Sequence, residues 1–166
     1  MKRYKQPATK TKRPESSDEE ALNKIFRYCA YQERSHREVK TKLFEYGLSS
    51  AKVDQVISYL ITERFLNEER YAKAFAGGKF RIMKWGKLKI QKELEISGVS
   101  PRNIAKGLAE INPSEYSKTL HGLLKKKSNQ IEGDNIYTKK NKVARFAMGK
   151  GYEPELIWEM VNDLIG

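Results

Sequence analysis

A pattern centred on a glycine occurs three times along this 166-residue chain and constrains the fold more than any other sequence feature. Its centres are Gly47, Gly98 and Gly151, which lie 51 and 53 residues apart. Glycine readily takes the left-handed backbone conformation that ends a helix, and a regular period of this length is typical of tandem structural units. The pattern therefore predicts three copies of one small module, with the glycines as helix caps.

The positions around each glycine keep their chemical character in all three copies. Apolar residues stand eight and four residues before it, and one, six and thirteen residues after it. The three sets, in chain order, are Val39, Leu43, Leu48, Val53 and Leu60; Ile90, Leu94, Val99, Ile104 and Ile111; Val143, Ala147, Tyr152, Ile157 and Leu164. This spacing predicts a helix on each side of the glycine, with the apolar side chains turned to one core.

Polar residues and prolines indicate where these helices begin. Ser35, followed three residues later by Glu38, has the form of a capping box at the start of the helix that Gly47 ends. After the glycines, the signals that a new helix begins are Ser49 or Ser50, Ser100 with Pro101, and Pro154.

A leading helix is also expected in each copy, because apolar residues recur there at helical spacing. The predicted apolar stripes are Leu22, Ile25, Phe26, Cys29 and Ala30; then, after Asn67 as a plausible cap, Tyr71, Ala74, Phe75 and Ile82; then Tyr116, Leu120, Leu123 and Leu124. No stretch shows the sustained alternation of a sheet protein. We therefore predict an all-α protein of three tandem three-helix repeats.

The expected boundaries follow from this pattern. Residues 1–18 form a disordered basic tail, since their many Lys and Arg residues and few apolar ones cannot offset the entropy of ordering. Repeat 1 spans residues 19–65, repeat 2 spans 66–112 and repeat 3 spans 113–166.

The charge balance favours a polyanionic partner. The formal net charge of +12 creates a field that attracts nucleic acid, acidic membranes or acidic protein faces. The single cysteine, Cys29, cannot form an internal disulfide, and no apolar run approaches the roughly 18 residues that cross a bilayer. We expect a cytoplasmic monomer with no membrane segment.

Catalytic chemistry finds no support in the sequence. His36 and His121 lie far apart, and neither belongs to a spacing that binds metal. No phosphate-binding loop of the form Gly-x-x-x-x-Gly-Lys-Ser/Thr occurs. We therefore expect a protein that is not an enzyme and has no catalytic residues, metal or cofactor.

The segment of residues 79–92 is the sharpest candidate for a binding surface. Its basic residues are Lys79, Arg81, Lys84, Lys87, Lys89 and Lys92, without one acidic residue between them. They are interleaved with Phe80 and Trp85, and an exposed Trp can stack on a base or fill a pocket of a partner. The alternative is a solvated helix face with Phe80 and Trp85 in the core, and the sequence leaves both interpretations open.

A second basic cluster occupies almost the same register in the third copy. It consists of Lys139, Lys140, Lys142 and Arg145. If the repeats stack with a constant rotation, equivalent helices line one face and the two clusters act together. Ordinary solubilising charge is the alternative.

Two segments of the chain resemble a known family. Residues 65–94 read FLNEERYAKAFAGGKFRIMKWGKLKIQKEL, which is similar to the central signature of the RecX family, and residues 33–71 resemble that family's first repeat. The resemblance covers residues 20–112 strongly and the third copy more loosely. It implies an elongated, curved array of repeats that lies along the groove of the RecA filament on DNA and inhibits the ATPase, strand exchange and coprotease activities of RecA. The alternative is a helical protein that binds single- or double-stranded DNA directly, without sequence specificity.

Overall fold

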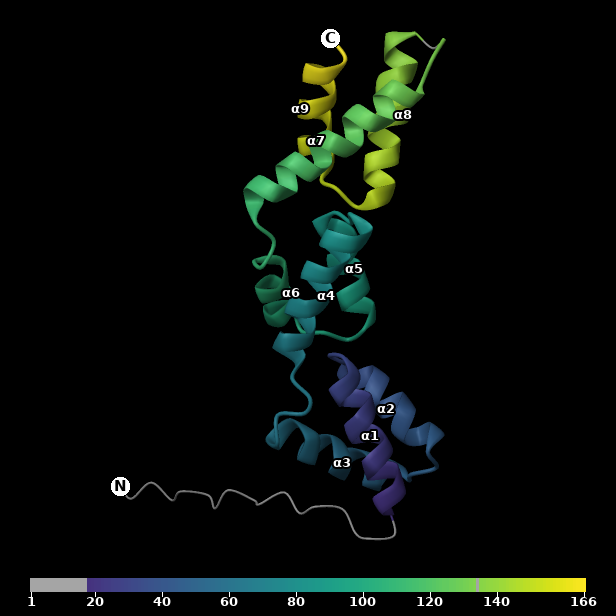
Figure 1. The fold of residues 1–166 in the computed structure, drawn as a ribbon, viewed down its shortest axis with the longest axis vertical. Helices are drawn as coiled ribbons and strands as arrows, with labels where there is room; N and C mark the ends of the chain where they lie inside the picture. The colour runs from purple at the N-terminus through teal and green to yellow at the C-terminus, as the bar shows by residue number, and fades with distance from the viewer. Residues whose placement is uncertain (1–17, 134) are drawn as a thin grey trace, which may run out of the picture. The chain divides into compact units, whose positions relative to one another are not determined.

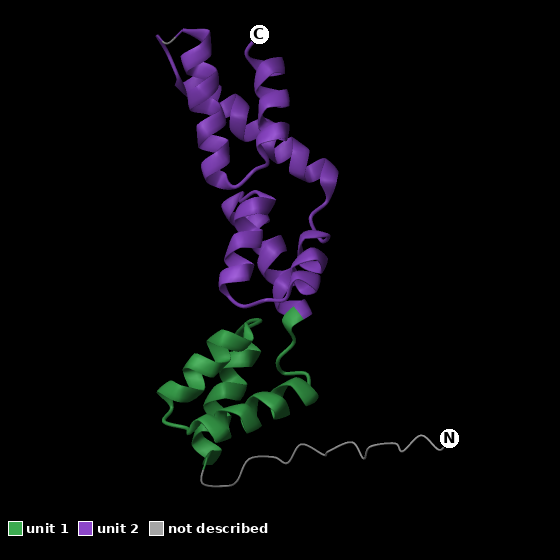
Figure 2. Ribbon diagram, turned by 180° about the vertical axis from the view of Figure 1, so that it is seen from behind, with its two compact units in different colours: residues 1–68 green, residues 69–166 purple. Residues whose placement is uncertain are grey.

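The computed structural model describes residues 18–133 and 135–166, and the regular elements there are all α-helices (Figure 1). The predicted basic tail lies outside this part of the chain, except for Asp18, whose carboxylate pairs with the Lys52 ammonium at 3.1 Å. None of the described helices is long and apolar enough to cross a membrane. The chain divides into two compact units, residues 1–68 and residues 69–166 (Figure 2).

The first unit holds one three-helix repeat with its own core. Its helices are α1 (Glu19–Tyr31), α2 (His36–Glu45) and α3 (Ser50–Thr62). Of the stripe predicted for α1, Leu22 and Ile25 are fully buried, whereas Ala30 is exposed. The buried side chains of this core are Leu22, Ile25, Val39, Leu43, Leu48, Val53, Val56, Leu60 and Leu66.

The second unit holds two further three-helix repeats on one shared core. Its helices are α4 (Glu68–Met83), α5 (Lys87–Ile96), α6 (Pro101–Leu108), α7 (Pro113–Gln130), α8 (Ile136–Lys150) and α9 (Pro154–Leu164). The long helix α7 packs against both α8 and α9 (Figure 1). One continuous cluster of buried residues runs from Tyr71 on α4 to Ile165 after α9, so repeats 2 and 3 share a core.

The three glycines end their helices in the same way, as the sequence predicts. Gly47, Gly98 and Gly151 have φ values of 87°, 78° and 95°. After each glycine the next residue folds back and donates its N–H to a carbonyl five residues earlier. These bonds run from Leu48 to Leu43 at 3.3 Å, from Val99 to Leu94 at 3.0 Å and from Tyr152 to Ala147 at 3.3 Å. Each terminus is therefore a Schellman motif, and its apolar contact explains why the residue after the glycine is buried.

The predicted helix starts are confirmed. Ser35 Oγ accepts a hydrogen bond from the Glu38 N–H at 3.0 Å. Of the two candidates after Gly47, Ser49 is the cap, and it accepts from the Lys52 N–H at 3.4 Å. Proline occupies the first turn of both α6 and α9, where its missing N–H costs no hydrogen bond.

The repeat register holds at every predicted core position except Leu164, which is half-buried while Ile165 is buried in its place. In α6, a Cβ on Gly107 would lie 2.7 Å from the Ala72 carbonyl oxygen, so glycine allows a close contact with α4. In α9 the buried residues after Ile157 are Val161 and Ile165, so the buried face is rotated by one residue relative to α3 and α6.

The stripe predicted for α4 is partly wrong. Ala74 is exposed, and the Ile82 side chain is 78% exposed. The buried face instead contains Ala72, Ala76 and Phe80. Since Gly107 packs on the backbone of Ala72, the close approach of α6 selects the side of α4 that carries small residues. Hydrophobic spacing alone does not carry that information.

Candidate functional site

The positive charge of the described chain is concentrated in the second unit. Residues 18–68 contain 8 basic and 9 acidic side chains, whereas residues 69–166 contain 19 basic and 11 acidic ones. All of the basic residues singled out in the sequence lie in this second segment. A polyanion is therefore attracted to repeats 2 and 3 far more than to repeat 1.

Four of these basic residues form two pairs at equivalent positions. Lys89 on α5 and Lys142 on α8 each stand nine residues before the glycine of their repeat, and Lys92 and Arg145 each stand six before it. Residues three apart on a helix share a face, so each pair points to one side of its helix. We call these four residues the basic track. Repeat 1 has Glu38 and Thr41 at the same two positions and lacks the pair.

Each pair lines a shallow hollow of about 330 Å³. The α5 pair meets α8 in the first hollow, whose lining side chains are Leu88, Lys89, Lys92, Glu93 and Met148, with Gly149 and Gly151. The α8 pair meets the end of α7 in the second hollow, whose lining side chains are Lys127, Ile131, Lys142, Arg145 and Phe146.

The two hollows lie along the same face of α8. Lys142 and Arg145 line one of them and Gly149 lines the other, and the spacing of these residues places all three on one side of the helix. The four residues from Arg145 to Gly149 rise by only about 6 Å. The two pairs of the basic track therefore line neighbouring hollows along α8 within the second unit.

Trp85 is half-buried beside the track and packs against the core. The Lys89 ammonium lies 4.5 Å from its ring centroid, and the Lys79 ammonium lies 5.0 Å from it. A cation over an indole face is stabilised by the ring quadrupole, so Trp85 holds two positive charges close together. Phe80, in contrast, is only 5% exposed and belongs to the core.

The remaining predicted residues lie elsewhere. Lys87 is turned toward α7, with its ammonium 4.9 Å from the Tyr116 ring centroid, and Lys140 donates to Asn162 Oδ1 on α9 at 3.2 Å. These two lysines are also equivalent, since each stands eleven residues before its glycine. Arg81 and Lys84 are exposed at the end of α4, and Lys139 is half-buried on α8. The structure therefore places four of the predicted basic residues in the track and the others outside it.

A junction between repeats 2 and 3, which the sequence did not reveal, fixes the start of α5. The N–H groups of Gly86 and Leu88 donate to the carbonyls of Lys150 and Gly151, at 2.8 and 2.9 Å. The carboxyl end of α8 thus caps the amino end of α5, where Gly86 has no side chain to cap it. A Cβ on Gly86 would collide with the backbone of Gly151. The only signal in the sequence was this glycine at a helix start.

Two tyrosines complete the junction. Tyr116 Oη accepts from the Lys87 N–H at 2.9 Å and donates to the Glu153 carboxylate at 2.8 Å. Tyr152 Oη donates to the Lys84 carbonyl at 2.9 Å, and the two rings lie 5.0 Å apart. Burial raises the pKa of Tyr116 far above its usual range and raises the pKa of Tyr152 to about 12. The junction therefore holds the two pairs of the basic track at a fixed separation.

No group of three or more His, Cys, Asp or Glu side chains that could hold a metal ion occurs in residues 18–133 and 135–166. His36 lies at the start of α2 in the first unit, and His121 lies within α7 in the second.

Comparison with known families identifies the architecture. Residues 21–60, 67–108 and 114–161 match the models of the first, second and third three-helix domains of RecX, in that order. The chain belongs to the RecX family. The predicted resemblance and the all-helical fold of three tandem three-helix domains are both confirmed.

Individual RecX proteins agree with this assignment. The chain is 27% identical to the regulatory protein RecX of Halalkalibacterium halodurans over 90% of its own length and 56% of the relative. It is also 27% identical to the RecX protein of Chlorobium phaeobacteroides, of which it covers 97%. A crystal structure of RecX from Lactobacillus salivarius has the same fold, with a TM-score of 0.79 at 21% identity, over 88% of this chain and 95% of that one.

These relatives are named as regulatory proteins, which agrees with the expectation of a regulator rather than an enzyme. The chain spans about half the length of several of the RecX relatives that it matches.

Proposed function

We propose that this RecX-family chain binds the RecA nucleoprotein filament and inhibits its recombinase, ATPase and coprotease activities, and so modulates DNA repair and recombination. The observation that carries this proposal is the match of all three RecX domains in chain order. The charge distribution supports it, because a filament on DNA is a long polyanion and the second unit carries the excess of basic residues.

The proposal extends to the domains and residues involved. A basic tail of residues 1–18 is followed by repeats at residues 19–65, 66–112 and 113–166, which bind along the filament groove. The filament contacts are assigned to the basic residues of segments 79–92 and 139–145 together with Trp85. Within that set, the basic track has the most regular arrangement, because its two pairs occupy equivalent positions and each pair lines a hollow.

The direct test is the ATPase activity of the RecA protein from the same organism, assembled on single-stranded DNA. We expect the chain to suppress ATP turnover at amounts well below one molecule per RecA, because one bound regulator affects many neighbours in a filament. Filament length, measured in parallel by electron microscopy, distinguishes capping or disassembly from simple blocking. Unchanged ATP turnover at low salt contradicts the proposal.

Direct binding of DNA without a protein partner is the second candidate function. The track supports it, since paired cations on exposed helix faces are suited to phosphate groups. Such binding has little sequence preference and depends steeply on salt. We further propose that the chain acts as a monomer in the cytoplasm, and light scattering of the purified chain at several concentrations tests the monomeric state.

A further inference from the structure

The hollow between α7 and α8 combines cations with an apolar floor. Lys127, Lys142 and Arg145 surround the side chains of Ile131 and Phe146. The Lys127 ammonium lies 5.1 Å from the Phe146 ring centroid, so a positive charge already sits over an aromatic face. Cations beside an apolar surface match the two parts of a nucleotide, a phosphate and an unpaired base.

The hollow between α5 and α8 repeats this arrangement one module away. Lys89 and Lys92 stand beside Leu88 and Met148, and here Glu93 also lines the hollow. Because the two hollows follow one face of α8, a single extended ligand can contact both without a change in the protein. A ligand with a regular series of negative charges makes the best use of equivalent cation pairs, and nucleic acid has such a series.

We propose that α5 and α8 together bind one single strand of nucleic acid, with its phosphodiester groups at the four residues of the basic track and its unpaired bases against the two apolar floors. The proposal deepens the proposed function and rests on it, because a regulator seated on a recombinase filament meets the strand which that filament encloses. A duplex presents its phosphates but keeps its bases stacked inside, so the floors favour a single strand.

The two hollows are expected to contribute unequally to the affinity for the strand. Glu93 brings a negative charge into the repeat 2 hollow, whereas the equivalent residue in repeat 3 is Phe146. Like charge repels a phosphate, and an aromatic ring offers a base a surface on which to stack. The repeat 3 hollow is therefore the stronger of the two contacts.

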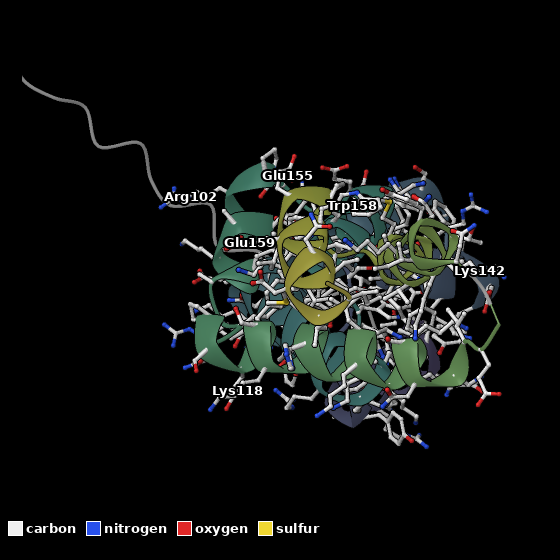
Figure 3. The ribbon with its side chains drawn as sticks, turned by 90° about the horizontal axis from the view of Figure 1, so that it is seen from above. Arg102, Lys118, Lys142, Glu155, Trp158 and Glu159 are labelled. Atoms are coloured by element: carbon white, nitrogen blue, oxygen red, sulfur yellow. The ribbon has the colours of Figure 1, made fainter. Side chains whose placement is uncertain are left out.

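The test compares three double variants of equal charge change. Lys89→Glu with Lys92→Glu removes the repeat 2 pair, and Lys142→Glu with Arg145→Glu removes the repeat 3 pair. Arg102→Glu with Lys118→Glu is the matched control. Arg102 on α6 and Lys118 on α7 are exposed, and they lie on the opposite side of the second unit from Lys142 (Figure 3). Circular dichroism melting of each variant establishes that it remains folded.

Fluorescence anisotropy measures binding of a labelled oligothymidine of about 30 nucleotides to the full chain, without any recombinase. Each track variant is expected to bind at least about tenfold more weakly, and the repeat 3 variant shows the larger loss. For each cation pair that is removed, the slope of log K for binding against the log of the salt concentration is expected to fall in magnitude by about 1.4. The reason is that each phosphate contact with a single strand contributes about 0.7 to that slope. The control variant keeps the slope of the unchanged chain.

Three results overturn the inference: an equal loss in the control variant, an unchanged salt slope in both track variants, or tighter binding of a duplex of the same length. The outcome is separable from the proposed function. If the unchanged chain fails to inhibit RecA, the proposed function fails while the oligonucleotide data still decide the inference. If the track variants keep full oligonucleotide affinity and the unchanged chain inhibits RecA, only the inference is overturned.

Discussion

Gly98 shows at the scale of one residue how a backbone requirement fixes a fold. Its φ of 78° lies in the left-handed region, where a Cβ crowds the neighbouring carbonyl oxygen. We expect Gly98→Ala to lower the free energy of unfolding by about 1–2 kcal/mol, because the helix end must either keep the strain or lose its Schellman bond. Denaturant unfolding followed by circular dichroism measures this change.

The matched control for Gly98→Ala is Gly122→Ala. Gly122 lies inside α7, and a Cβ there would have nothing within 4 Å. Alanine has the higher helix propensity, so this substitution is expected to raise stability by up to about 1 kcal/mol. A higher melting temperature for Gly98→Ala as well would contradict the assignment of Gly98 as a required helix cap.

The Tyr116 hydroxyl holds the first turn of α5 against repeat 3. Tyr116→Phe leaves the Lys87 N–H and the Glu153 carboxylate without this partner. We expect a loss of about 1–3 kcal/mol in the free energy of unfolding, the usual cost of a buried polar group left unsatisfied. Tyr137→Phe is the control, since Tyr137 is 77% exposed, and an equal loss in both variants would show that the junction contributes nothing specific.

The raised pKa of Tyr152 predicts how the same junction responds to alkali. In the unfolded chain this phenol loses its proton near its ordinary value of 10, and in the folded chain near 12. Between these pH values the unfolded state binds fewer protons than the folded state. The stability that Tyr152 contributes is therefore complete below pH 10 and is lost as the pH rises toward 12. We expect Tyr152→Phe to reduce the fall in stability between pH 10 and 12 by up to about 1.4 kcal/mol per pH unit. Denaturant titrations at several alkaline pH values measure it, and identical slopes in both proteins would refute this origin.

At the scale of the helices, the sequence predicts what depends on local chemistry. The glycine ends, the serine caps and the register around Val39, Ile90 and Val143 all follow from backbone preference and hydrophobic period. The exposed Ile82 and the rotated face of α9 do not, because each depends on how the helices pack against one another.

The candidate site likewise has features that the sequence predicts and features that only the packing of the helices determines. The basic residues are visible in the sequence, but periodicity alone did not separate the exposed Lys92 from Lys87, which lies over the Tyr116 ring. The close approach of Gly86 to the Gly151 backbone joins residues 65 positions apart, and no local pattern contains that information.

At the scale of the whole molecule, the number of cores differs from the number of repeats. Repeat 1 has a core of its own, whereas repeats 2 and 3 share one cluster of buried residues and the hydrogen bonds between α8 and α5. A helix whose first turn is capped by another repeat loses that cap when the other repeat opens. We therefore expect two cooperative units of unfolding in a chain with three repeats.

Hydrogen exchange of two equivalent variants tests this expectation. Leu43 and Leu94 stand four residues before their glycines and are both fully buried, so replacement of either by alanine costs about 2–5 kcal/mol. Leu43→Ala is expected to reduce amide protection in α2 and α3 and to leave α8 and α9 unchanged, because its cavity opens in the core of repeat 1. Leu94→Ala is expected to reduce protection in α5 and α6 and also in α8 and α9, because the shared core and the capped start of α5 couple these helices. If Leu94→Ala left the protection of α8 and α9 intact, repeats 2 and 3 would open separately, and the junction would not hold the two pairs of the basic track at a fixed separation.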